Sequence, residues 1–203
     1  MTPLQARRLC DFHDGAAKIG AASDLWRAIE DNHRHNGLLW GEEDLARRRH
    51  APEAEIAGNK RAIDRYNQQR NDAIERIDEV LSGLLLEKKS SASARLNSET
   101  PGAMIDRLSI LSLKIRNMRL QTQRNDVDRT HVESCRAKLE RLGEQRADLA
   151  ACLDRLLEEC GRGESCFKIY RQFKMYNDPR LNPAVYGEKS GEKSGKKSGR
   201  KKG

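Results

Sequence analysis

A run of residues between positions 26 and 47 begins apolar and becomes polar without leaving one face of a helix. Its members are spaced three or four residues apart, which keeps them within one arc of roughly 80°. They are Trp26, Ile29, His33, Asn36, Trp40, Asp44 and Arg47. The aromatic and aliphatic members predict that this arc faces a core. The polar members then point inward, where an unpaired polar group costs roughly a few kcal/mol, so they need partners or a ligand.

A second helical segment follows Pro52 and repeats the pattern. Its apolar stripe runs from Ile63 to Leu84, and a polar arc lies beside it. An antiparallel hairpin centred on Pro52 would bring together residues whose numbers sum to about 104. That register pairs Asp44 with Lys60, Trp40 with Asp64, Asn36 with Asn67 or Gln68, and His33 with Asn71. The alternative is a solvated face on the second helix with one buried ion pair.

We call the facing polar positions of these two segments the polar seam and take them as a candidate binding site. The seam comprises His33, Asn36, Trp40, Glu43, Asp44, Arg47, Lys60, Asp64, Asn67, Asn71 and Glu75. If the seam binds a ligand, leucines in place of Asn36 and Asn67 should raise stability and reduce function, because binding sites retain destabilising polar groups.

The other segments also have helical periodicity. An amphipathic helix is predicted within residues 1–22, and Ser23 is a natural N-cap for the next helix. Thr100 and Pro101 start a helix that is apolar on nearly every side, whose Asp106, Arg107 and Lys114 need buried partners. Thr130 and Glu133 match a capping box for the last long helix. The sequence therefore predicts an all-α bundle of four to five mostly antiparallel helices.

The predicted domain organisation is a single helical domain over residues 1–186. It consists of the N-terminal helix (1–22), a core bundle (23–162) and an aromatic C-terminal segment that wraps back onto the bundle (163–186). Residues 187–203 repeat Lys, Gly and Ser and are predicted to be disordered. That tail holds seven Lys or Arg and two Glu, so it carries +5 of the net charge of +8. The tail could accordingly bind a polyanion, either a nucleic acid or a membrane surface. The nearly neutral body is not expected to do so.

Five cysteines are present, with no C-x-x-C pair, which favours free thiols in a reducing compartment. A zinc site built on Cys160 and Cys166 is a weaker alternative. No apolar run is long enough for a signal peptide or a membrane span, so we expect a cytoplasmic protein.

A second candidate site is the start of the apolar helix at Thr100. Backbone N–H groups in a first helical turn are unpaired, and the helix dipole favours an anion there. Gly102 leaves the approach open, and two cations follow. The candidate anion-binding residues are Thr100, Gly102, Ala103, Arg107 and Lys114. A sugar nucleotide or phosphorylated sugar fits such a site, provided that Glu99 is paired or binds a hydroxyl.

An enzyme is the other class considered. Glu30-x-x-His33 and Asp128-x-x-His131, with Glu75 as a bridging carboxylate, resemble the motifs of di-iron bundles. Metal-free acid–base chemistry by His33 with Asp44 or Asp64 is a further option. Neither pattern supplies a nucleophile or a second catalytic group, so the sequence assigns no catalytic residue, no metal and no cofactor.

Four segments carry a resemblance to a bacterial family known as domain of unknown function 4254. They are Trp40-x-x-Glu43-Asp44-x-Ala46-Arg47-Arg48, Lys60-Arg61-x-Ile63-Asp64-x-x-Asn67-Gln68-x-Arg70-Asn71-Asp72, residues 96–111 with the motif Glu99-Thr100-Pro101-Gly102-x-Met104-Ile105-Asp106-Arg107, and the stretch from Phe167 to Pro183. The resemblance spans roughly residues 20–186. It implies an all-helical cytosolic protein, often encoded near glycosyltransferases and other surface-polysaccharide genes, with no established activity or catalytic residues. The expected role is an accessory or ligand-binding protein of bacterial surface-glycan biosynthesis. A glycosyltransferase or a phosphorylated sugar is the expected partner, and a homo-oligomer is an option.

Overall fold

The structure, a computed structural model, describes residues 2–17, 23–85, 93–171, 178 and 180–183. Within these residues the chain forms five helices and two short strands: α1 (Ala6–His13), α2 (Asp24–Ala46), α3 (Glu53–Leu85), β1 (Arg95–Leu96), α4 (Pro101–Thr122), α5 (Arg129–Arg162) and β2 (Ser165–Cys166). The predicted all-α fold class is confirmed. The chain divides into two units, Met1–Ile169 and Tyr170–Gly203, and every one of these elements lies in the first.

Side-chain caps set where the helices begin. The Ser23 hydroxyl accepts the Trp26 N–H at 3.4 Å, and the Thr100 hydroxyl accepts the Ala103 N–H at 3.2 Å, as the sequence predicts. At α5 the predicted capping box is wrong. The cap is Asp128, whose carboxylate accepts the N–H of His131 at 2.7 Å. Glu133 instead pairs with Arg129 one turn earlier in the same helix.

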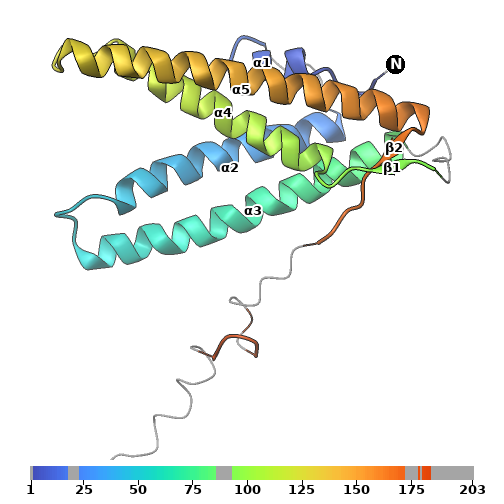
Figure 1. Ribbon diagram of the computed structural model, residues 1–203. Coiled ribbons are helices and arrows are strands. Elements are labelled where there is room, and N and C mark those ends of the chain that lie inside the picture. The colour runs from blue at the N-terminus through green and yellow to red at the C-terminus, as the bar shows by residue number, and fades with distance from the viewer. Residues whose placement is uncertain (1, 18–22, 86–92, 172–177, 179, 184–203) are drawn as a thin grey trace, which may run out of the picture. The chain divides into compact units, whose positions relative to one another are not determined.

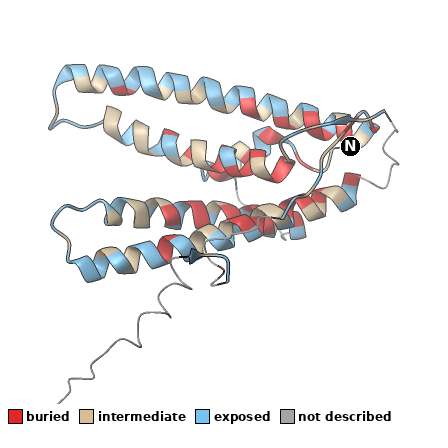
Figure 2. Ribbon diagram, turned by 60° about the horizontal axis from the view of Figure 1, so that its bottom comes forward, coloured by how far each residue is buried: buried red, intermediate tan, exposed pale blue. Residues whose placement is uncertain are grey.

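The long helices form two antiparallel hairpins, α2 with α3 and α4 with α5 (Figure 1). The hairpins come together at the end that carries α1 and separate toward their turns, which are residues 47–52 and 123–128. Burial follows this arrangement, since the buried residues gather where the hairpins meet (Figure 2). The apolar side chains that are fully buried there are Leu9, Ile29, Ile77, Leu81, Ile105, Leu108, Leu153 and Leu157. Two of the cavities described below are lined by residues between 36 and 47 of α2 and its turn, toward the diverging ends.

The strands were not predicted. β1 lies in the segment expected to be a polar loop, and it pairs in parallel with β2 in the register Arg95 to Ser165. Ion pairing reinforces the strand pair, because the Arg95 guanidinium lies 2.7 Å from the Glu159 carboxylate. This contact ties the chain just before α4 to the end of α5, and so helps to fix where α4 starts.

Two sequence predictions fall largely outside the described residues. The tail at 187–203 lies outside them entirely, as do residues 172–177, 179 and 184–186 of the aromatic segment. The domain boundary at residue 186 therefore stays a prediction. None of the described helices combines the length and the apolar character that a membrane crossing needs.

Candidate functional site

A buried polar network joins α2, α3 and α4, with Asp106 of α4 at its centre. One carboxylate oxygen of Asp106 accepts hydrogen bonds from the side-chain amides of Asn32 and Asn36, each at 2.9 Å. The Asn36 amide also lies 3.0 Å from the Ser109 hydroxyl. From α3, the Nε of Arg70 lies 4.0 Å from the same Asp106 oxygen. We call these five residues the Asp106 network. Hydrogen bonds to Asp106 satisfy the buried amides of Asn32 and Asn36, whereas the Nε of Arg70 is buried without a hydrogen-bond partner among the described residues.

The network shows where the predicted seam is wrong. Asn36 turns toward α4, and His33 bonds to the Ser109 hydroxyl at 2.8 Å rather than meeting Asn71. Asn71 is buried and accepts from Arg70 at 3.2 Å. Asp44 does not pair with Lys60, because Lys60 pairs with Asp64 on its own helix at 3.3 Å.

The register of the α2–α3 hairpin also differs. Asn59 donates to the Glu42 carboxylate at 2.7 Å, and His35 stacks on Tyr66. Facing residue numbers therefore sum to 101 rather than 104, a shift of nearly one helical turn.

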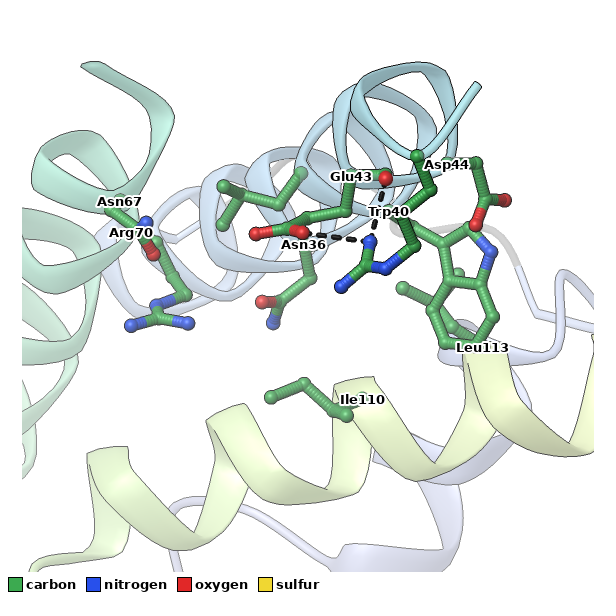
Figure 3. A pocket seen from close by; sticks show the side chains of 10 residues that line it. Asn36, Trp40, Glu43, Asp44, Asn67, Arg70, Ile110 and Leu113 are labelled. Atoms are coloured by element: carbon green, nitrogen blue, oxygen red, sulfur yellow. Dashed lines mark hydrogen bonds and ion pairs between the residues drawn. The ribbon is translucent and has the colours of Figure 1, made fainter. Parts of the chain in front are cut away.

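Beside the network lies a cavity of about 370 Å³ between α2, α3 and α4 (Figure 3). We call it the amide cavity. It is lined by Asn36, Leu39, Trp40, Glu43, Asp44, Arg47, Asn67, Arg70, Ile110 and Leu113. Asn67 and Arg70 approach the cavity from α3, and Ile110 and Leu113 approach it from α4. Trp40 lies at one end. Asn36 and Asn67 thus share one cavity, although they do not form the predicted direct pair.

A second cavity of about 620 Å³ lies on the other side of Trp40. We call it the basic cavity. It is lined by Trp40, Asp44, Lys114, Asn117, Met118, Gln121, Lys138, Arg141, Leu142 and Gln145, from α2, α4 and α5. Trp40 and Asp44 belong to both cavities, so we treat the two together as the Trp40 groove.

The structure brings only some of the predicted site residues to the Trp40 groove. Seven of them line the groove: Asn36, Trp40, Glu43, Asp44, Arg47, Asn67 and Lys114. Lys60, Asp64, Asn71 and Glu75 line neither cavity. Asp44 and Arg47 are exposed, so the expectation that they point into a core is wrong. Arg47 bonds to the Glu43 carbonyl at 2.5 Å and pairs with its carboxylate at 2.7 Å.

The helix N-terminus at Thr100 is not open to an anion. The Gly102 N–H donates to the Asp78 carboxylate at 2.6 Å, and the Ala103 N–H is taken by Thr100. The expectation of two unpaired donors is therefore wrong, because the chain supplies its own carboxylate there. Burial raises the pKa of Asp78 to about 6, while hydrogen bonds from Thr100 and Gly102 act in the opposite direction.

The two cations that follow this N-terminus do not need the buried partners that the sequence suggested. Arg107 is exposed and holds both carboxylate oxygens of Glu99, at 2.8 and 2.9 Å. Lys114 is exposed and lines the basic cavity. Only Asp106 of the three charged residues is buried, and its partners are those of the Asp106 network.

A third cavity of about 320 Å³ lies where α1 meets α2 and α4, and we call it the histidine cavity. The rings of His13 and His33 stack there with centroids 4.6 Å apart. His13 is 7% exposed, and neither of its ring nitrogens has a hydrogen-bond partner among the residues that the structure describes. Burial lowers the pKa of His13 to about 3, with further lowering from His33 and Arg146. Burial also lowers the pKa of His33. Both rings are thus neutral at pH 7.

This stack predicts acid sensitivity. The pKa of His13 in the fold, about 3, lies below its unfolded value of 6.5, so its contribution is fully present above pH 6.5 and is lost as the pH falls. Between pH 7 and pH 5 the loss should be about 1–2 kcal/mol. His13→Phe removes the titration and should flatten the fall in melting temperature over this range. Equal slopes of melting temperature against pH for the variant and the parent would contradict the assignment of the acid sensitivity to His13. Asp78, whose raised pKa acts in the opposite direction, is present in both proteins, so its effect cancels in the comparison.

The enzyme patterns are not brought together. His33 bonds to Ser109 on α4, whereas His131 lies 3.4 Å from the Cys135 sulfur at the start of α5. Among the described residues no group of three His, Cys, Asp or Glu side chains is placed to hold a metal ion. The Ser109–His33 contact resembles a nucleophile–base pair, but Ser109 is fully buried and lines none of the three cavities.

The family assignment rests on a match that covers more than half of the chain. The sequence model of the family described as "Protein of unknown function (DUF4254)" matches residues 26–169. The chain belongs to this family. No curated protein and no solved structure matches it. The DUF4254 span contains every residue of the Trp40 groove, whereas α1, with His13, lies before it.

Proposed function

We propose that this DUF4254 protein binds a phosphorylated sugar or sugar nucleotide in the Trp40 groove, as an accessory or ligand-binding protein of bacterial surface-glycan biosynthesis. The observation that carries the proposal is the position of Trp40 between two cavities of different chemistry. One side offers hydroxyl-binding groups and the other offers cations. The glycan context comes from the family resemblance, and the ligand class comes from the groove.

The amide cavity suits a sugar ring. Sugar hydroxyls both donate and accept hydrogen bonds, and the cavity presents an amide at Asn67, a carboxylate at Glu43 and a guanidinium at Arg70. The Trp40 ring and the side chains of Ile110 and Leu113 supply apolar surface for the C–H face of a sugar. A few polar groups on an otherwise apolar wall is the usual composition of a small-molecule site.

The basic cavity suits the phosphate part. Lys114, Lys138 and Arg141 are exposed cations on its wall, and charge-assisted hydrogen bonds to phosphate are stronger than neutral ones. Asn117, Gln121 and Gln145 add side-chain amides. Asp44 is the one carboxylate of the lining, and it lies at the boundary with the amide cavity, where a sugar hydroxyl would be.

Isothermal titration with UDP-glucose, glucose 1-phosphate and glucose tests the ligand class. We expect binding to weaken in that order as phosphates are removed. Trp40→Ala and the double variant Lys138→Ala/Arg141→Ala should each weaken UDP-glucose binding by about tenfold or more, the effect of losing roughly 1.4 kcal/mol. Arg136→Ala is the matched control, because Arg136 is an exposed cation of α5 that lines neither cavity.

The glycan role is tested separately in a strain that lacks the gene. We expect loss of surface polysaccharide, restored by the wild-type chain and by Arg136→Ala but not by Trp40→Ala.

UDP-glucose stands for the class of sugar nucleotides. The same titration with GDP-mannose and UDP-N-acetylglucosamine varies the base and the sugar. Absence of saturable binding for all three sugar nucleotides, or equal affinity of the Trp40→Ala variant, would overturn the proposal.

A further inference from the structure

The histidine cavity has features of an anion site that are separate from the Trp40 groove. Its polar lining comes from three helices and the turn after α1: His13, Asp14, His33, Ser112, Arg116 and Arg119. Both arginines are exposed, so their guanidinium groups are free to turn toward a bound anion. Leu113 lines this cavity and the amide cavity alike, which makes the two sites neighbours.

His33 has one ring nitrogen left for a ligand. Its Nδ1 lies 2.8 Å from the Ser109 hydroxyl, and that hydroxyl oxygen also accepts from Asn36 at 3.0 Å. This contact occupies Nδ1, and once the ring takes up a proton both ring nitrogens are donors. Nε2 of the protonated ring is then a donor on a residue that lines the cavity.

His13 supplies the second sign of an incomplete site. Its side chain is more than nine-tenths buried in the cavity wall, yet within the described part of the chain neither ring nitrogen has a hydrogen-bond partner. A buried donor without a partner costs about 1–3 kcal/mol, so a fold retains one where something else satisfies it or where it serves a purpose. The His13 ring stacks on the His33 ring with an interplanar angle of 23°, so the two rings lie face to face in the cavity wall.

The charges around the stack favour an anion. Asp14 of the turn after α1 is the carboxylate of the lining, and Arg146 of α5 neutralises it through contacts of 2.7 and 2.8 Å. Asp11 lies on α1 and is exposed, and His33 is the titratable group that α2 contributes. Arg116 and Arg119 of α4 form no ion pair with any described residue, so both add positive charge at the cavity.

We propose that the histidine cavity is a second ligand site, which binds a phosphate group through Arg116, Arg119, Ser112 and Nε2 of His33, with uptake of a proton by the histidine pair. The bound negative charge favours the charged imidazole over the neutral one, so a proton enters when the anion binds. The proton comes from solvent and returns to it on release. The same phosphate chemistry is offered by inorganic phosphate and by a small phosphate monoester.

Affinity and proton uptake are measured with two probes. Titration with inorganic phosphate and with methyl phosphate, followed by the ring C–H resonances of His13 and His33, distinguishes the free ion from the ester. Sulfate keeps its charge between about pH 6 and pH 8, so its pH dependence reports only on the protein. We expect sulfate to bind about tenfold more tightly at pH 6 than at pH 8, with the ring resonances of His13 and His33 shifting together.

Variants separate this site from the groove. Arg116→Gln/Arg119→Gln should weaken phosphate and sulfate binding about tenfold or more, because it removes two charge-assisted contacts at exposed positions. His33→Gln retains an amide for Ser109 and should abolish the pH dependence. Lys138→Ala/Arg141→Ala and Arg136→Gln should leave the ring shifts unchanged. The proposal is overturned if phosphate and sulfate do not bind saturably, or if sulfate binds equally at pH 6 and pH 8. It is also overturned if the ring shifts are lost in Lys138→Ala/Arg141→Ala but kept in Arg116→Gln/Arg119→Gln.

Discussion

Gly102→Ala is expected to lower the free energy of unfolding by about 3 kcal/mol, the upper range for forcing an extra group into a packed position. A Cβ at residue 102 would lie 2.6 Å from the backbone oxygen of Ile74 and 2.8 Å from the Asp78 side chain. The backbone oxygen belongs to the middle of α3 and has no freedom to move aside. Relief requires α4 to shift, which would also lengthen the 2.6 Å bond from the Gly102 N–H to Asp78.

Urea unfolding followed by circular dichroism measures this effect through the transition midpoint. Gly58→Ala is the matched control. Gly58 lies inside α3 with no neighbouring atom within 4 Å of an added Cβ, so this change should stabilise the protein by about 0.5–1 kcal/mol. Equal effects of the two substitutions would contradict the close approach of α4 to α3.

Asp106→Ala is expected to be the second large loss, of about 3 kcal/mol, because it leaves two buried amides without their shared acceptor and a half-buried arginine without its countercharge. Asn32 and Asn36 each lose a 2.9 Å hydrogen bond, and Arg70 loses its nearby countercharge. Asp64→Ala is the control. The sequence places Asp64 in the same polar seam, but Asp64 is exposed and, among the described residues, pairs only with Lys60, so its removal should change stability by less than about 1 kcal/mol. If the urea midpoints of Asp106→Ala and Asp64→Ala coincided, the Asp106 network would not stabilise the packing of α2, α3 and α4.

The structure reverses one expectation drawn from the sequence. Leucines at positions 36 and 67 were expected to stabilise the bundle. Asn36, however, donates to Asp106 and Ser109, so Asn36→Leu leaves both without that donor and should destabilise the fold. Asn67 lines the amide cavity and is half-buried, so Asn67→Leu alone should be nearly neutral in stability.

The positions of the helices could be predicted from the sequence because residues within each helix, its cap and its apolar stripe, determine where it lies. Ser23 and Thr100 cap α2 and α4 as predicted, and the apolar periodicity of the long segments gives their extents. The register of α2 against α3 was not local. We placed the pivot at Pro52, which directly precedes α3, whereas facing pairs centre between His50 and Ala51, inside the turn. A misplacement of one or two residues at a pivot shifts every facing pair by twice as much.

The candidate site was only partly readable for a related reason. Polar residues on the inner face of α2 signalled a buried network, but their partner Asp106 lies 70 residues beyond Asn36, on a helix that is apolar nearly all round. A helix of that kind shows no single face from which packing could be predicted. Asn32, one turn before Asn36, was the overlooked signal. The anion hypothesis for Gly102 failed because the satisfying carboxylate, Asp78, came from a different helix.

The most direct test of a ligand in the Trp40 groove uses the two tryptophans of the chain. Each gives one indole N–H resonance. Trp26 is buried against Phe12, with ring centroids 5.7 Å apart, whereas Trp40 is half-buried and lines both cavities of the groove. On titration with UDP-glucose, GDP-mannose or UDP-N-acetylglucosamine, we predict a saturable shift of the Trp40 resonance for at least one ligand and an unchanged Trp26 resonance. A Trp40 resonance that does not move with any of the three, or a shift confined to Trp26, would contradict the proposed function.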